Sequence, residues 1–307
     1  MAASILSAPY FHNEAAATAY VESRVWPRGA ACPRCGSMDR VGKLQGKSTR
    51  IGVWKCYECR KPFSVKVGTI FEDSHVGLHL WLQAIALVAA SKKGISANQL
   101  HRTLGVTLKT AWFMGHRIRE AMRSTSRMLG GEGTSGIVEA DETYFGRTEG
   151  HGKGMRLLGK RKVFALMERG GAVRSFHVER VTARSLRAIM HENIAKSARI
   201  MTDSASVYRN LPDDGYRSHE TVNHLDREYS RDDVTTNTVE GYFGILKRGL
   251  YGTYQHCGKN HLHRYLAEFD FRYSNRKSCG IDDAQRADNL LKSVTGKRLM
   301  YQTTRSG

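Results

Sequence analysis

The spacing of four cysteines constrains this chain more than any other feature of its sequence. Cys32 and Cys35 form one Cys-x-x-Cys pair, and Cys56 and Cys59 form a second pair after twenty intervening residues. Each pair presents two thiolates from a tight turn, and four such ligands complete a closed tetrahedron around zinc. A redox dithiol is the weaker alternative, because it needs one such pair beside a βαβ pattern rather than two pairs. The sequence therefore predicts a zinc ribbon within residues 1–70, with structural Zn held by all four cysteines.

The charge of the chain predicts a polyanionic partner. It has 48 Lys and Arg residues against 29 Asp and Glu, a net charge of +19. The excess is +7 in residues 31–70 (9 − 2), +4 in 71–135 (8 − 4), +1 in 136–240 (17 − 16) and +7 in 241–307 (12 − 5). Nucleic acid is the commonest polyanion that such a protein binds. The pattern indicates nucleic-acid-binding surfaces that flank a segment whose carboxylates have another role.

Targeting and membrane signals are not evident in the sequence. The first twenty residues lack a basic start followed by a continuous apolar stretch, so they do not match a secretory signal. The longest largely apolar run, from Leu78 to Ala90, has 13 residues and is too short to cross a bilayer. We therefore expect a cytoplasmic protein without a membrane partner, associated with the nucleoid in a prokaryote. In that compartment six cysteines favour metal ligation over disulfides, and Cys257 and Cys279 are interpreted as ordinary thiols.

Residues 71–129 show a helical pattern with two breaks. The apolar run described above predicts a buried helix, and a second helix begins at Ser96. A turn at Gly105 separates it from a third, basic helix that Thr107 can cap. A short helix, a turn and a longer basic helix outline a helix-turn-helix, although three-helix bundles without a DNA role show the same pattern. The glycine-rich segment 130–136 predicts a linker after this module.

Beyond residue 136 strands alternate with helices, and carboxylates occur where they lower strand propensity. Asp141 lies inside one predicted strand, and Asp203 ends another. In a later predicted helix Asn237, Glu240 and Lys247 share one face beside an apolar stripe. Any one acid in a strand means little, but the ordered set on strand, strand and helix favours a site. Carboxylate oxygens suit Mg²⁺, and two such ions about 3.5–4 Å apart support phosphodiester cleavage and strand transfer.

Taken in order, these motifs resemble the DDE-type transposases of bacterial insertion sequences, in the group with an N-terminal zinc ribbon and a ribonuclease H-like catalytic domain. The resemblance covers roughly residues 20 to 280. It rests on CPRCGS, YECRKPFSVKVGTIFEDS, VEADETYFG, MTDSASVY, NTVEGYFGILKRGLYGTY and HLHRYLAEFDFRYSNR. It implies an α/β fold with a ribonuclease H-like mixed sheet flanked by helices in residues 137–280. The zinc ribbon and the helical module precede this domain, and a basic C-terminal tail, residues 281–307, follows it.

The resemblance also implies roles for the acidic set. Asp141 and Asp203 match the first two metal-binding catalytic acids, and Glu240 matches the third. Lys247 resembles the basic residue that follows the last acid and contacts DNA phosphate. Related groups place Asn in the third catalytic role, so Asn237, one turn from Glu240, stays an alternative or an assisting residue. Glu142, which follows Asp141 in the sequence, is expected to point to the opposite face of the strand and is therefore the weaker candidate.

The activity that the resemblance implies is DNA transposition. The ribbon and the helical module would bind the terminal inverted repeats of a mobile element. The α/β domain would carry out metal-dependent strand cleavage and strand transfer into target DNA, with two Mg²⁺ or Mn²⁺ ions as cofactors. A homo-oligomer on double-stranded DNA is expected. Two other classes stay open: a non-enzymatic zinc-ribbon and helix-turn-helix DNA-binding regulator, and a structure-specific nuclease of the same fold that cuts without joining.

Overall fold

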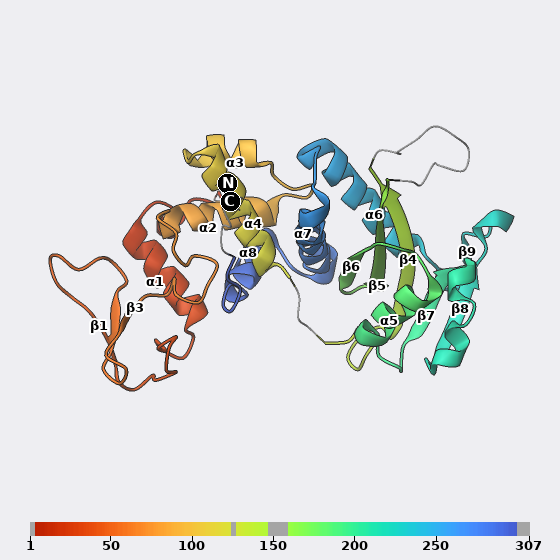
Figure 1. The fold of residues 1–307 in the computed structure, drawn as a ribbon, viewed down its shortest axis with the longest axis horizontal. Helices are drawn as coiled ribbons and strands as arrows, with labels where there is room; N and C mark the ends of the chain where they lie inside the picture. Colours follow the sequence, from red (N-terminus) through yellow and green to blue (C-terminus); the bar gives the residue numbers. More distant parts are fainter. Residues whose placement is uncertain (1–3, 124–126, 147–158, 300–307) are drawn as a thin grey trace, which may run out of the picture. The chain divides into compact units, whose positions relative to one another are not determined.

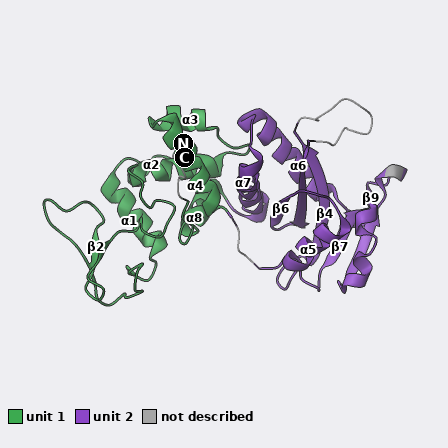
Figure 2. Ribbon diagram, viewed as in Figure 1, with its two compact units in different colours: residues 1–122, 282–307 green, residues 123–281 purple. Residues whose placement is uncertain are grey.

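The computed structural model describes most of the chain, namely residues 4–123, 127–146 and 159–299. The chain divides into two compact units, coloured separately in Figure 2. Unit 1 comprises residues 1–122 together with residues 282–307, and unit 2 comprises residues 123–281. Within the described ranges, no helix is long and apolar enough to cross a membrane.

Unit 1 begins with a helix and a small three-stranded sheet. A 3₁₀ turn at Pro9–Phe11 leads into α1 (Glu14–Val25). The antiparallel strands lie in the order β1-β2-β3, with bounds β1 (Val41–Lys43), β2 (Trp54–Cys56) and β3 (Pro62–Phe63). Cys32, Cys56 and Phe63 form the buried core of this sheet. A core of three residues is too small to hold a domain together alone, which is the usual reason for a structural metal.

Four further helices complete unit 1: α2 (Leu78–Ala90), α3 (Ala97–Leu104), α4 (Leu108–Ala121) and α8 (Asp283–Lys292). Ser96 caps α3, because its side chain accepts a hydrogen bond from the backbone of Gln99. Gly105 ends α3 in the left-handed conformation with φ 66°, and Thr107 then caps α4. The helix, turn and helix predicted from the sequence are therefore present, and Thr107 caps the second of them as predicted.

Residues 281–307, predicted from the sequence to be a basic tail, contain helix α8. Leu290 and Leu291 of this helix are buried. Arg286 donates a hydrogen bond of 3.1 Å from Nη1 to the carbonyl oxygen of Ala89, at the end of α2. Helix α8 packs on α2 and α1 and is part of the compact core of unit 1.

Unit 2 is built on a five-stranded mixed sheet with the order β6-β5-β4-β7-β8 (Figure 1). Its strands are β4 (Ile137–Phe145), β5 (Arg161–Glu168), β6 (Val173–Val178), β7 (Arg199–Asp203) and β8 (Ser218–Val222). Strands β4, β5 and β6 are antiparallel neighbours, whereas β7 and β8 run parallel to β4. Three antiparallel strands continued by two parallel ones form the ribonuclease H-like sheet expected from the sequence. A short ribbon follows, formed by β9 (Ser230–Arg231) and β10 (Val234–Thr235).

Helices cover both faces of this sheet: α5 (Ala183–Asn193), α6 (Asn237–Gly249), continued by a π-helical turn at Leu250–Tyr254, and α7 (Leu262–Ser274). Successive side chains of a strand point to opposite faces. Val138 and Ala140 therefore pack into the core formed with α5, while Phe145 packs into the core formed with α6 and α7. Odd-numbered positions of β4, including residue 141, face α6.

The glycine-rich segment predicted as a linker lies inside unit 2. Leu129 forms a β-bridge with Ile194. Gly130 has φ 67°, and a Cβ at this position would lie 2.5 Å from the Cβ of Ala198. The backbone at Gly130 therefore lies close to Ala198 of the same unit. The boundary between the units falls between residues 122 and 123 rather than within 130–136.

Candidate functional site

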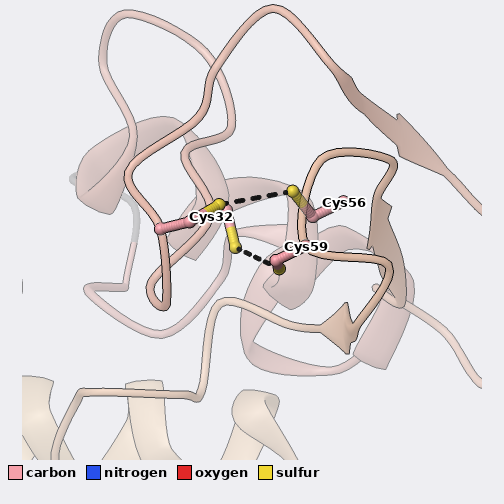
Figure 3. A group of neighbouring side chains, drawn as sticks. Cys32, Cys56 and Cys59 are labelled. Atoms are coloured by element: carbon pink, nitrogen blue, oxygen red, sulfur yellow. Dashed lines mark hydrogen bonds between the residues drawn. The ribbon is translucent and has the colours of Figure 1, made fainter.

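The four cysteine sulfurs converge in the ribbon of unit 1. Their Sγ atoms all lie within 4.8 Å of one another, with 3.7 Å between Cys32 and Cys59 and 3.5 Å between Cys35 and Cys56 (Figure 3). Four sulfurs bound to one zinc at about 2.3 Å in a tetrahedron are about 3.8 Å apart, whereas a disulfide requires about 2 Å. The spacing therefore fits a structural zinc and not a disulfide.

Asp141 and Asp203 lie on adjacent parallel strands at the same edge of the sheet of unit 2. The register between β4 and β7 pairs Ile137 with Arg199 and Glu139 with Met201. Two residues further along each strand the positions are 139 + 2 = 141 and 201 + 2 = 203. The pairing between β4 and β7 ends at Glu139 and Met201, so Asp141 and Asp203 each lie two residues beyond the last pair, with both side chains on the same face of the sheet.

Glu240 comes to this edge from the first turn of α6. Its carboxylate Oε1 accepts a hydrogen bond of 3.1 Å from Thr236 Oγ1, and His224 Nε2 lies 3.7 Å from the same oxygen. The side chain is 42% exposed, so it is accessible to solvent and ligands. The apolar stripe predicted for this helix, formed by Val239, Phe243, Leu246 and Leu250, is buried.

The electrostatics of Asp141 connect the three elements. The pKa of Asp141 is raised to about 8, mainly by burial and in smaller part by the negative charges of Glu142, Asp203 and Glu240. A hydrogen bond of 2.7 Å from the Glu142 backbone N–H to Asp141 Oδ1 opposes this shift. The acids of β4, β7 and α6 therefore act on one another, and a divalent cation would relieve their repulsion.

Glu142 points to the other face of β4 and has a different environment. Its Oε2 accepts a hydrogen bond of 2.6 Å from the hydroxyl of Tyr208, in the 3₁₀ helix Ser206–Tyr208. Burial, together with the charge of Asp203, raises the pKa of Glu142, although the Tyr208 hydrogen bond lowers it. Glu142 thus has a protein partner on the α5 side of the sheet.

Two further predicted site residues lie on α6. Asn237 is the first residue of the helix and is exposed, and its backbone N–H donates to Thr235 Oγ1 at 3.1 Å. Lys247 is half-buried and lies seven residues after Glu240, which is about 10 Å along the helix. Both lie on the same side of the helix as Glu240, as the sequence pattern predicts.

The donor set fits a divalent metal by its chemistry. Carboxylate oxygens are the hard ligands that Mg²⁺ and Mn²⁺ prefer. In the parts of the chain that the structure describes, the cysteines form the one group of three or more His, Cys, Asp or Glu ligands within 4.8 Å of one another. Asp141, Asp203 and Glu240 are therefore more widely spaced than the sulfurs of the ribbon.

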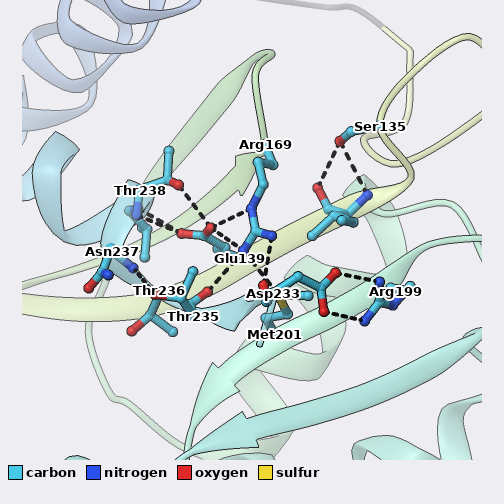
Figure 4. Close-up of polar contacts among 12 residues, drawn as sticks. Ser135, Glu139, Arg169, Arg199, Met201, Asp233, Thr235, Thr236, Asn237 and Thr238 are labelled. Atoms are coloured by element: carbon cyan, nitrogen blue, oxygen red, sulfur yellow. Dashed lines mark hydrogen bonds and ion pairs between the residues drawn. The ribbon is translucent and has the colours of Figure 1, made fainter. Parts of the chain in front are cut away.

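Sequence reasoning did not single out Glu139, which has more polar contacts than any of the three predicted acids. It lies on β4, is fully buried and forms an ion pair of 2.8 Å with Arg169 (Figure 4). It also accepts hydrogen bonds from Thr238 and from the backbone of Val239, in the first turn of α6. The signal available in the sequence was an acid within a predicted apolar strand, two residues before Asp141, because acids are seldom found at buried positions unless they are paired.

Two family models match the chain in succession. Residues 12–62 match the transposase zinc-ribbon domain, and residues 133–274 match the ISXO2-like transposase domain. A protein of Halobacterium salinarum, described as an uncharacterized protein in transposable element ISH50, is 28% identical over 265 residues. That alignment covers 80% of this chain and 86% of the relative.

Solved structures with remote similarity are complexes of the Mos1 transposase. The Mos1 strand transfer complex has a TM-score of 0.31 at 12% identity and covers 69% of this chain and 74% of that chain. A pre-cleavage Mos1 transpososome has a TM-score of 0.24 at 13% identity and covers 65% and 77%. Residues 12–62 thus belong to the transposase zinc-ribbon family and residues 133–274 to the ISXO2-like transposase family, with the ribbon preceding the transposase domain.

Proposed function

We propose that this chain binds the terminal inverted repeats of its element and catalyses metal-dependent DNA strand cleavage and strand transfer into target DNA. The observation that carries the proposal is the placement of Asp141 and Asp203 on adjacent parallel strands, with Glu240 in the first turn of α6, which is hydrogen-bonded to β4 through Glu139. These acids come from two strands and a helix that are far apart in the sequence. In this proposal all three are catalytic residues, and a homo-oligomer assembled on DNA performs the reaction.

Asp141 and Asp203 would hold the divalent ions between them, and Glu240 would complete the second ion's site. When bound, such ions activate the attacking hydroxyl and stabilise the leaving oxygen of the phosphodiester. The chain itself supplies the acids in fixed positions. Lys247, about 10 Å from Glu240 along α6, would hold a DNA phosphate. Asn237, at the start of the helix, remains the alternative for the third role.

Helices α3 and α4 support the binding of DNA by unit 1. Recognition helices contact bases with residues near their N-terminus. In α4 the N-terminal half is exposed at Leu108, Lys109 and Trp112, whereas the second half, including Ile118, is buried. A helix that is anchored at one end and exposed at the other can enter the major groove of an inverted repeat.

A basic hollow in unit 2 supports contact with the DNA backbone near the acids. Lys160, Lys162, Arg180 and Lys259 are among the residues that line it. The hollow lies beside the C-terminal end of β4, because Arg161, which lines it, pairs with Phe145 in the sheet. Asp141 lies four residues before Phe145 on β4, about 13 Å along the strand, so a duplex held in the hollow by its phosphates is long enough to reach the acidic site as well.

The test is cleavage of DNA that carries the inverted repeats, in Mg²⁺ or Mn²⁺. Asp141→Asn, Asp203→Asn and Glu240→Gln are each expected to lower the cleavage rate at least about 1,000-fold. Binding of end DNA in a mobility-shift assay should be unchanged, because these acids do not contribute to phosphate contacts. If Glu240→Gln cleaves normally and Asn237→Ala does not, Asn237 has the third role.

The products separate the remaining classes of protein. Strand-transfer products identify a transposase, and nicking without joining identifies a nuclease. If the wild-type protein binds ends but cleaves in neither metal, the regulator is the correct class.

A further inference from the structure

The first turn of α6 is held by a side chain from another element. Its N-cap, Thr236, makes no side-chain capping hydrogen bond. Instead Glu139 Oε2 accepts from the backbone N–H groups of Thr238 (2.9 Å) and Val239 (3.1 Å), and Oε1 accepts from Thr238 Oγ1 (2.9 Å). The N–H groups of a first turn lack partners within the helix and carry partial positive charge, so they favour a carboxylate.

Arg169 fixes the other side of the same carboxylate. Its Nε and Nη2 donate to Glu139 Oε1 at 3.1 Å and 2.8 Å. Arg169 also donates to the carbonyl oxygens of Asp233 (2.8 Å) and Thr235 (3.4 Å), in the segment that enters α6. Its Nη2 lies 3.1 Å from Met201 Sδ on β7. Five donor groups therefore surround the buried carboxylate of Glu139. Two come from Arg169, which directly follows β5, and three come from the first turn of α6.

Glu139, Met201 and Thr238, which are labelled in Figure 4, each lie two residues before one of the three proposed catalytic acids. On β4, Glu139 lies two residues before residue 141. On β7, Met201 lies two residues before residue 203. On α6, Val239 immediately precedes residue 240. Because strands and a helical turn are stiff over one or two residues, a displacement of Glu139, Met201 or Val239 would also displace the neighbouring acid.

We propose that Glu139 and Arg169 are a positioning pair that holds the first turn of α6, and with it Glu240, at the correct distance from Asp141 and Asp203. The inference rests on the proposed function of the three acids. Neither residue touches the reacting groups; both act through Glu240. A buried ion pair contributes little to stability compared with well-packed apolar residues, whereas its directional hydrogen bonds define a geometry.

The test compares Glu139→Gln with a matched control in the same unit. In the variant the amide NH₂ faces donors whichever way it is turned, so the contact with the first turn of α6 is weakened. Glu268→Gln is the control, because Glu268 and Arg272 also form a buried ion pair, on α7, with side chains 0% and 6% exposed. Arg169→Lys is the second variant; it keeps the charge and loses the two-pronged contact.

The first readout is amide hydrogen exchange, which does not require catalysis. We expect faster exchange at residues 238–240 in both cluster variants, with β4 and β5 exchanging as in the wild type. Glu268→Gln should leave residues 238–240 unchanged. Wild-type protection of the first turn of α6 in Glu139→Gln and Arg169→Lys would overturn the proposal.

The second readout is single-turnover cleavage of end DNA at saturating protein. We expect cleavage by Glu139→Gln to slow about 100-fold, because a misplacement of about 1 Å has an effect of this size. The dissociation constant for end DNA should be unchanged, and Glu268→Gln should cleave at the wild-type rate. Equal losses in Glu139→Gln and Glu268→Gln would show a general structural effect and overturn the proposal. A wild-type protein that does not cleave would refute the proposed function, while the exchange readout would still decide the positioning role.

Discussion

Asp270 joins three elements of unit 2 through one carboxyl group. It lies on α7 and accepts hydrogen bonds from the Ser175 backbone N–H (2.8 Å) and Oγ (2.7 Å) on β6, and from the Tyr242 hydroxyl (2.5 Å) on α6. The residue as a whole is only partly buried, but its carboxyl group is enclosed. Burial raises the pKa of Asp270 to about 7, although the hydrogen bonds from Tyr242 and Ser175 and the charge of Arg174 lower it.

The raised pKa makes the stability of unit 2 depend on pH in a definite direction. The pKa of the unperturbed group is 3.8, so between about pH 4 and pH 7 the folded state binds a proton that the unfolded state has released. Stability is therefore lost as pH rises through this window, and the full loss persists above pH 7. The shift of 7 − 3.8 = 3.2 pH units corresponds to at most about 4 kcal/mol, of which about 2 kcal/mol falls between pH 5.5 and pH 8.

Asp270→Asn removes this titration and preserves the shape of the side chain. The amide oxygen of the asparagine can accept a hydrogen bond from the Ser175 backbone N–H. Its NH₂ group can donate to the hydroxyls of Ser175 and Tyr242, because a hydroxyl group can act as an acceptor as well as a donor. We expect the stability of the variant relative to the wild type to increase by about 2 kcal/mol between pH 5.5 and pH 8.

The measurement is the free energy of opening of β6 and α7 from amide hydrogen exchange, corrected at each pH for the intrinsic exchange rate. Comparing the variant with the wild type at the same pH cancels the titration of all other groups. A difference that is constant between pH 5.5 and pH 8, or that favours the wild type as pH rises, would refute the reasoning. All four tryptophans lie in unit 1, so tryptophan fluorescence would not report on this opening.

Two further predictions concern the metal and the DNA. The purified wild-type protein should contain one zinc per chain, and Cys56→Ser should lose it. Loss of the zinc should also shift the fluorescence of Trp54, which packs on the ribbon core, to longer wavelength. Metal analysis should show that the control variant Cys279→Ser retains the zinc, and retention by Cys56→Ser would contradict the assignment. Lys247→Gln should weaken DNA binding equally for all sequences and lower the slope of log affinity against log salt concentration by about 1. Arg248→Gln, at the exposed neighbouring position, should have a smaller effect. Equal slopes for Lys247→Gln and the wild type would exclude a phosphate contact.

Features with a local cause could be predicted from the sequence. The helix over the apolar run Leu78–Ala90 has the predicted bounds, and strand β7 ends at Asp203 as predicted, because each is a continuous pattern with a clear end. Ser96 was predicted as the start of a helix from the break in the pattern before it, and Thr107 from the capping chemistry of its side chain. The pairs of cysteines predicted their own convergence, since two tight turns and one metal define the geometry.

Features that depend on distant contacts could not be predicted in this way. The contact of Glu139 with Val239 joins positions 100 residues apart, and no local pattern reports it. Helix α8 had a local signal, the capping box of Asp282 and Gln285, but its low mean hydropathy resembles a tail until the surface of α2 that it covers is known. In both cases the partner lies in a part of the chain that sequence periodicity cannot relate to the residue.

The packing of α8 on α2 means that unit 1 is completed by the end of the chain. During synthesis, all of unit 2 is made before residues 283–292. Unit 1 therefore cannot close its core when its own first 122 residues appear, although domains generally fold in the order of synthesis. A copy of the gene with a stop codon after unit 2 would encode an intact ribonuclease H-like sheet, but its ribbon and helices would lack Leu290 and Leu291 in their core. Late truncations of the gene should thus damage the N-terminal unit first.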